Sequence, residues 1–270
     1  MEWSKLKNII IVILLLVNGF LLVLVGGQEI QVRRYEHSAL TGAAAVLEQG
    51  GITVETDVLK QAKSGLTAQS ISRDIQAEAD FARTLLGGDT AVTDQGGGLY
   101  VYTGAQGSMV FRSGGTVEAA LTDYPVEPEQ REALVRQLLA DLGLRCELLG
   151  SQGDAIVCRQ LLEDAPLFSC RLTFQFSGER LLSVSGSLVL GSPVSESSAQ
   201  SLSVPTAVIR FLDGIRASGD VCTAVTEMRP GYRSSQSFDA AIHLTPVWLV
   251  STDVSEYYLD SITGRLARVE

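Results

Sequence analysis

The chain has 270 residues, 46% of them hydrophobic, so it is long enough and apolar enough for one or two domains with packed cores. Its 31 acidic and 21 basic residues give a formal net charge of −10. Nucleic-acid binding needs clustered lysines and arginines that neutralise phosphates, so this balance argues against DNA and RNA as partners. The composition indicates a folded, acidic protein that repels anionic surfaces.

The first predicted element is a membrane helix. Residues 9–25 are apolar apart from Asn18 and Gly19, and at ~1.5 Å per residue they give roughly 25 Å of helix. Because a bilayer core is about 30 Å thick, we assign residues 9–27 to a single transmembrane anchor. A polar amide inside a membrane either marks a helix–helix contact or is simply tolerated, and both interpretations of Asn18 stay open.

The charges around this helix predict its orientation. Lys5 and Lys7 precede the apolar run, and a short basic N-terminal tail normally stays in the cytoplasm. We therefore expect residues 1–8 to be cytoplasmic and residues 28–270 to be extracytoplasmic. Cleavage as a signal peptide is the alternative, because residues 25–27 include small side chains. The length of the run and the lack of an A-x-A site favour an uncleaved anchor.

The segment of residues 28–125 is predicted to be a first α+β unit. Apolar residues recur at helical spacing over residues 35–47 and 75–86, and a pair of glycines ends each helix. Strand-like stretches lie at residues 52–54, 99–102, 108–111 and 116–121. Pro125 and Pro128 indicate a boundary after this unit.

Residues 126–270 are predicted to form a second α+β domain that starts with a helix. Pro128 suits the first helical turn, because proline has no N–H to lose there. Leu134, Leu138 and Leu142 recur on one side of this helix. They predict the face that packs against the rest of the domain.

The rest of this domain is predicted to be mostly strands. Residues 145–191 are rich in predicted strands; residues 171–176 alternate between polar and apolar side chains, and a bulge is expected at Gly186. A helix is predicted over residues 204–217, followed by closing strands that include residues 257–259 and 266–269. Because helices only twice interrupt the strands after Pro128, the predicted class is α+β with antiparallel sheets.

The cysteines allow two interpretations. Cys146, Cys158, Cys170 and Cys222 form no C-x-x-C pair, and no histidine lies near them in the sequence, which argues against a zinc site. They are either small buried side chains or, in an oxidising compartment, partners in disulfides. The sequence does not determine which cysteines pair.

The usual signatures of catalysis are missing from the sequence. It contains no G-x-S-x-G elbow, no H-E-x-x-H motif and no phosphate-binding glycine loop. Its two histidines, His37 and His243, stand apart from each other and from the cysteines. We therefore predict that the protein is not an enzyme and uses no cofactor or metal.

Four short motifs, taken in order, carry a family resemblance. The chain opens with Met1-Glu2-Trp3-Ser4-Lys5-x-Lys7 directly before the apolar run, and Leu47-Glu48-x-Gly50-Gly51-Ile52-x-Val54 follows beyond it. Pro246-Val247-Trp248 and Tyr257-Tyr258-Leu259-Asp260-x-x-x-Gly264 lie near its end. Together they resemble the YycI regulators of Gram-positive bacteria, which belong with the YycH proteins.

The resemblance implies both a fold and a role. It implies PepSY-like α+β units outside the membrane and no catalytic residues. It also implies an accessory of a sensor histidine kinase, WalK (also called YycG), which governs cell-wall metabolism, with a YycH-like protein as companion. An accessory of this kind acts by contacting one state of the kinase better than the other.

Two surfaces are our candidates for partner contacts. One is the anchor face with Asn18 and Gly19; the other comprises the aromatic residues Trp248, Tyr257 and Tyr258 of the C-terminal strands. Core packing of a hairpin is the alternative role for these aromatic residues. The alternative function is an anchored extracytoplasmic module that binds or inhibits a peptidase or another envelope protein.

Overall fold

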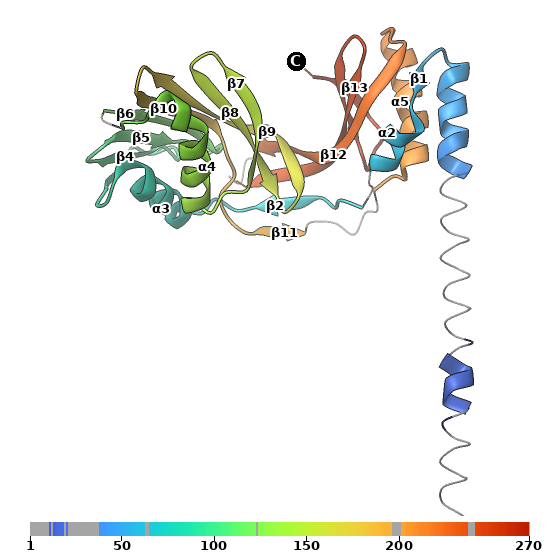
Figure 1. Cartoon of the computed structure of the whole chain (residues 1–270), viewed down its shortest axis with the longest axis horizontal. Coiled ribbons are helices and arrows are strands. Elements are labelled where there is room, and N and C mark those ends of the chain that lie inside the picture. Colours follow the sequence, from blue (N-terminus) through green and yellow to red (C-terminus); the bar gives the residue numbers. More distant parts are fainter. Residues whose placement is uncertain are drawn as a thin grey trace, which may run out of the picture.

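The fold is a mixed α+β arrangement of helices and a large, mainly antiparallel sheet, seen here in a computed structural model (Figure 1). The structure describes residues 11, 13–18, 20, 38–62, 65–122, 124–195, 201–236 and 241–269. A helix covers residues 38–49. The later elements are β1 (Thr53–Val54), α2 (Thr56–Gln61), β2 (Gln69–Ile71), α3 (Ile75–Leu86), β3 (Ala91–Asp94), β4 (Tyr100–Gly104), β5 (Gly107–Phe111), β6 (Thr116–Leu121), the 3₁₀ turn η1 (Pro128–Gln130), α4 (Arg131–Asp141), β7 (Cys146–Gln152), β8 (Ala155–Leu162), β9 (Ala165–Ser177), β10 (Arg180–Ser187), β11 (Pro193–Ser195), α5 (Val204–Ser218), β12 (Ala224–Gln236), β13 (Ile242–Thr252), β14 (Glu256–Asp260) and β15 (Leu266–Arg268). The predicted α+β class is confirmed.

Most of the predicted anchor, residues 9–27, lies outside the described residues, and so does Gly19. Asn18 is described as helical and exposed, and its side-chain amide donates a hydrogen bond to the Leu14 carbonyl, 2.9 Å away in the same helix. Among the residues that the structure describes, no helix is long and apolar enough to cross a membrane. The anchor and its orientation therefore stay predictions.

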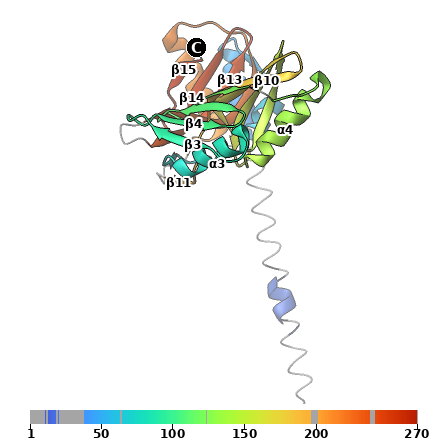
Figure 2. The same ribbon diagram turned by 90° about the vertical axis from the view of Figure 1, so that its left-hand side faces the viewer.

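One continuous stretch of chain, residues 73–191, forms what we call the inserted lobe. Its strands lie in the order β3-β4-β5-β6-β10-β9-β8-β7, with antiparallel pairing throughout the described residues. Helices α3 and α4 cover one face of this sheet (Figures 1 and 2) and share a single hydrophobic cluster with it. In β9 the residues Leu172, Phe174 and Phe176 are buried while those between them are not, as their alternation predicts.

Two distant stretches of chain build the other lobe, which we call the composite lobe. Residues 38–62 supply a helix, β1 and α2, and residues 201–269 supply α5 and the strands β12 to β15. Phe211 of α5, Trp248 of β13 and Leu47 of the first helix share one hydrophobic cluster. Figure 1 shows the blue helix beside the orange α5, on the same side of the C-terminal strands. Residues 38–62 and residues 201–269 thus complete each other's core.

The lobes meet where β9 reaches β12. A parallel bridge pairs Leu167 with Tyr232, and β2 runs beside β13. At Gly231 a Cβ atom would lie 2.5 Å from the carbonyl oxygen of Pro166, so only glycine allows this close approach of the strands. The junction is a continuous packed contact, because residues of both lobes share a third hydrophobic cluster.

The predicted division at residue 125 does not follow this packing. Val126 and Leu138 lie in the same hydrophobic cluster as Phe81 and Leu121. The reason is that β10, from the second predicted domain, pairs with β6, from the first. A boundary there cuts through one core.

Two local predictions need correction. In α4 the buried residues are Val135, Leu138 and Leu139, whereas Leu134 and Leu142 only flank the core. The bulge expected at Gly186 lies instead between Leu181 and Ser183. Glycine is needed at position 186 because a Cβ atom there would lie 1.9 Å from the Arg171 carbonyl oxygen, with φ at +142°.

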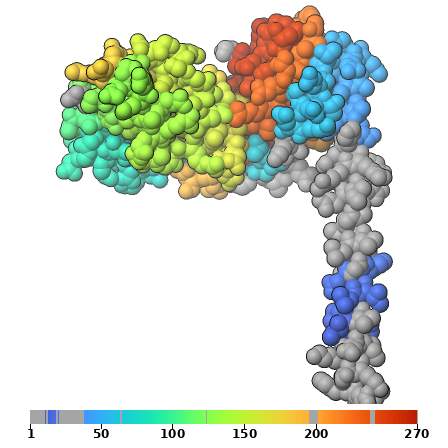
Figure 3. Space-filling view, in the orientation of Figure 1, coloured from blue at the N-terminus to red at the C-terminus, as the bar shows by residue number. Residues whose placement is uncertain are grey.

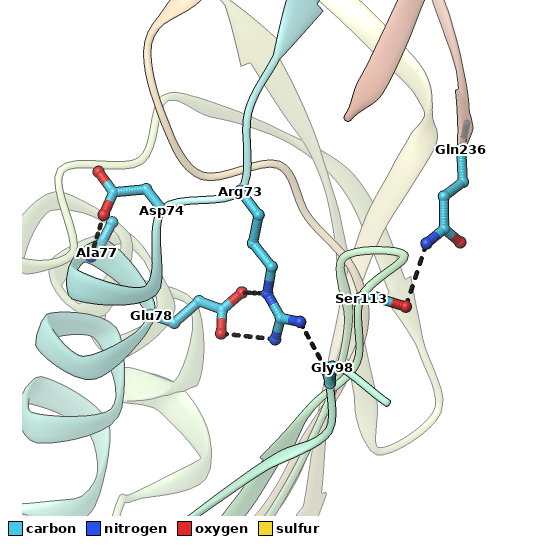
Figure 4. Close-up of polar contacts among 7 residues, drawn as sticks. All are labelled: Arg73, Asp74, Ala77, Glu78, Gly98, Ser113 and Gln236. Atoms are coloured by element: carbon cyan, nitrogen blue, oxygen red, sulfur yellow. Dashed lines mark hydrogen bonds and ion pairs between the residues drawn. The ribbon is translucent and has the colours of Figure 1, made fainter. Parts of the chain in front are cut away.

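A buried ion pair fixes the start of α3 (Figure 4). Asp74 caps the helix by accepting a hydrogen bond from the Ala77 backbone N–H at 3.0 Å. One turn along, both carboxylate oxygens of Glu78 accept hydrogen bonds from Arg73, at 2.6 and 2.9 Å. Arg73 also donates to the Gly98 carbonyl, which joins α3 to the loop before β4. The side chains of Arg73 and Glu78 are only 13% and 5% exposed, so each charge depends on the other.

Replacing Tyr102 by phenylalanine is expected to raise the free energy of unfolding by about 1 kcal/mol at neutral pH. The Tyr102 hydroxyl is buried and has no hydrogen-bond partner among the described residues. Burial raises its pKa to about 12 from 10.0. The wild type should therefore lose stability as pH rises from the unfolded pKa through the folded one, and the phenylalanine variant should lack this part of the loss. Urea unfolding across this pH range measures both effects; a variant less stable than the wild type at neutral pH contradicts the prediction.

Candidate functional site

The three aromatic residues predicted as partner contacts lie on two different faces. Trp248 and Tyr257 are 1% and 2% exposed and pack in the composite core, where Tyr257 meets Phe211 edge to face. They are core residues rather than surface contacts. Tyr258 points to the opposite face, because successive residues of a strand alternate. Of the three, only Tyr258 lines an open surface.

That surface is the face of the C-terminal strands away from α5. It faces the inserted lobe, and Figure 3 shows a notch between the green inserted lobe and the red C-terminal strands. A cavity of about 460 Å³ lies on this face. We call it the arginine groove; its lining includes Arg233, Thr245, Val247, Tyr258, Asp260 and Arg265.

Aromatic rings and guanidinium groups are stacked beside the groove. Phe168 of β9 lies against Tyr258, with ring centroids 5.8 Å apart. The guanidinium of Arg233 lies 5.7 Å from the Tyr258 centroid, and that of Arg159 lies 5.3 Å from the Phe168 centroid. Such cation–π contacts orient arginine side chains while leaving their N–H groups available.

A carboxylate of the inserted lobe binds an arginine of the composite lobe near the groove. Glu147 of β7 accepts hydrogen bonds from Arg159 of β8 at 3.1 Å and from both terminal nitrogens of Arg229 of β12. Burial lowers the pKa of Arg159, and the charge of Glu147 counteracts that effect. The shared carboxylate holds the β7–β8 hairpin against the composite lobe.

Three other arginines of this region have no carboxylate partner among the described residues. Arg171, Arg233 and Arg265 are exposed, and none forms an ion pair within the part of the chain that the structure describes. Burial raises the pKa of Tyr258, and the charges of Arg171, Arg159 and Arg233 act in the opposite direction. The groove is therefore a cationic surface on a protein whose formal charge is −10.

The chemistry of the groove suits binding. Guanidinium groups donate paired hydrogen bonds to carboxylates, and an aromatic wall covers the apolar part of a peptide. The one carboxylate in the lining, Asp260, accepts two backbone hydrogen bonds at 2.8 Å within its own turn, from Ile262 and Thr263. Among the described residues, no group of histidines, cysteines and carboxylates is arranged to hold a metal ion.

Sequence reasoning missed this groove for a topological reason. Its arginines come from β12 and the β14–β15 turn, and Arg171, near Tyr258, comes from β9; these segments are far apart in the chain. One signal was present: Arg229 and Arg233 lie on the same face of β12, four residues apart. Without the pairing of β9 and β12, nothing in the sequence placed Arg171 beside them.

Comparisons with known proteins give similarity at the level of shape only. No protein-family model and no curated protein matches the chain. A crystal structure of an uncharacterized protein from Eubacterium rectale is 11% identical, with a TM-score of 0.45 over 77% of this chain and 86% of that chain. The C-terminal domain of YpeB from Bacillus megaterium is 10% identical, with a TM-score of 0.38 over 74% of this chain and 99% of that domain. At these TM-scores the likenesses identify neither a family nor an activity.

Proposed function

We propose that this protein is a non-catalytic, membrane-anchored regulator that binds and modulates a sensor histidine kinase of a two-component system controlling cell-wall metabolism. The resemblance to YycI supports this role, and it also supports PepSY-like units and a YycH-like companion. An N-terminal apolar run with the length of a transmembrane helix supports the location.

The observation that carries the binding part of the proposal is the arginine groove. Arg233 and Arg265 flank Tyr258, a side chain with one aromatic face and one polar end. We propose that this groove receives an extended, acidic segment of the partner's extracytoplasmic region. Opposite charges speed the encounter and select the partner, and the aromatic wall adds apolar contact.

Replacing Arg233 and Arg265 together by alanine is expected to weaken partner binding roughly tenfold or more, since each replacement removes a charge-assisted contact. The matched control replaces Arg83 and Arg136, exposed arginines on α3 and α4 with the same total charge. The control variant should bind like the wild type. The measurement is affinity purification of the tagged full-length protein from native membranes, with the partner quantified by mass spectrometry.

A second variant, in which an unrelated apolar helix replaces residues 9–25, separates the two candidate contact surfaces. If a sensor kinase fails to co-purify with this variant alone, the contact lies in the membrane. If it fails to co-purify with the groove variant alone, the contact lies outside the membrane. Recovery of a peptidase or another envelope protein in place of a kinase supports the inhibitory module instead. Equal recovery of the kinase with both variants and the control contradicts the proposed contact surfaces.

A further inference from the structure

Three of the four cysteines meet on the inserted lobe's sheet. The register of β7 and β8 pairs Cys146 with Gln160 and Leu148 with Cys158. Cys146 and Cys158 are therefore diagonal neighbours on one face, and both contact the hydrophobic cluster under α3 and α4. Cys170 lies close by on β9, the other neighbour of β8.

The register places the side chains of Cys146 and Cys158 on the same face as diagonal neighbours. Their interaction raises the pKa of Cys146 and lowers that of Cys158. Cys170 differs: its thiol donates to the Ser234 hydroxyl at 3.8 Å, and burial raises its pKa to about 11. Cys146 and Cys158 pack in the same hydrophobic cluster, whereas Cys170 packs in the cluster at the lobe junction, and this favours the first pair over the others.

The two thiols differ in access. Cys158 is fully buried, whereas Cys146 is half-buried on β7, which among the described strands pairs with β8 alone and forms an edge of the sheet. Diagonal partners lie about 7–8 Å apart at Cα, beyond the roughly 4.4–6.8 Å usual for a disulfide, so the bond requires the backbone to move. The register of β7 shifts just beyond, between Leu148 and Gly150. A small movement of this edge strand brings the two sulfur atoms within bonding distance.

We propose that Cys146 and Cys158 form a disulfide by exchange with a small-molecule or protein disulfide. Cys146, the more accessible thiol, first loses its proton to solvent; its thiolate then attacks the external disulfide, forms a mixed disulfide and releases one external thiolate. The Cys158 thiolate then attacks the Cys146 sulfur, closes the internal bond and releases the second external thiolate. The external disulfide gains two electrons, the two cysteines lose them, and their two protons go to solvent or to the released thiolates.

The bond has a structural consequence beyond the two residues it joins. It fixes β7 to β8 on either side of the pair formed by Glu147 and Arg159. Glu147 also holds Arg229 of the composite lobe. The oxidised protein therefore keeps the inter-lobe carboxylate in place more firmly than the reduced one. This inference does not depend on the proposed function.

A tryptic digest distinguishes the possible pairings. Trypsin cleaves on both sides of residues 146–159, so Cys146 and Cys158 lie in one peptide. Cys170 lies in the next peptide, residues 160–171. The full-length chain is purified reduced in detergent, equilibrated with oxidised and reduced glutathione, denatured, alkylated and digested.

The expected product is the first peptide, without alkyl groups and two hydrogen atoms lighter than its dithiol form. Replacing Cys170 by alanine should leave that product unchanged. Replacing Cys158 by alanine should stop the reaction at its first step, so that Cys146 carries glutathione. Recovery of the wild-type peptide with two alkyl groups, or joined to the peptide that contains Cys170, overturns the proposal.

Discussion

Replacing Glu78 by alanine is expected to lower the free energy of unfolding by about 3–5 kcal/mol. The substitution leaves the Arg73 guanidinium, whose side chain is 13% exposed, without its carboxylate. The Gly98 carbonyl and the Tyr100 ring, 4.9 Å away, remain as partners, but neither carries a compensating charge. An uncompensated buried charge costs much more than the net value of the pair. Urea unfolding, followed by circular dichroism, measures the change.

The same helix provides a matched control. Asp80 pairs with Arg83 at 2.6 Å, the same N–O distance as in the Arg73–Glu78 pair. The side chains of Asp80 and Arg83, however, are both more than half exposed. Replacing Asp80 by alanine should change stability by less than about 1 kcal/mol. Replacing Arg73 by methionine and Glu78 by leucine together should cost far less than the single change at Glu78. Equal losses for Glu78 and Asp80 contradict the assignment of a buried, mutually dependent pair.

Replacing Trp248 by alanine is expected to cost about 3–5 kcal/mol of stability, since it removes one of the largest fully buried side chains of the composite lobe. The indole N–H has no hydrogen-bond partner among the described residues. Phenylalanine at this position should therefore cost much less, because it keeps most of the apolar volume and removes the unpaired donor. Thermal and urea unfolding of both variants measure these losses.

Tyr258 provides the comparison on the other face of the same sheet. It is half-buried and borders the arginine groove, so alanine there should reduce stability less than at Trp248. Partner binding should instead fall, because the groove loses its aromatic wall. If the Tyr258 variant bound the partner like the wild type and the Trp248 variant had wild-type stability, the assignment of Trp248 to the core and Tyr258 to the binding face would be wrong.

Local patterns predicted the elements well where burial follows the chain's own periodicity. The helix predicted over residues 75–86 has the observed bounds of α3, and the strand at residues 116–121 has those of β6. The helix predicted over residues 204–217 is confirmed as α5, with Phe211 and Ile215 buried. In each case one side of the element packs against a core, so the apolar residues recur with the period of the element.

What the sequence did not predict depends on contacts between distant segments. The division at residue 125 followed the prolines, but the pairing of β6 with β10 joins the two sides. The choice between Tyr257 and Tyr258 needed the register of β14, because both are aromatic and adjacent. The groove needed β12, β13 and the β14–β15 hairpin side by side.

The order in which the chain is made separates the two lobes in time. Residues 38–62 emerge from the ribosome before the inserted lobe, yet their core partners Phe211, Trp248 and Leu259 emerge after it. The inserted lobe draws its strands from residues 73–191 and has its complete sequence well before then. The helix over residues 38–49 therefore lacks its core partners, and Leu47 stays uncovered, until the inserted lobe and the segments after it have been synthesised. A chain that stops before α5 keeps the strands of the inserted lobe but never acquires the cover for that helix.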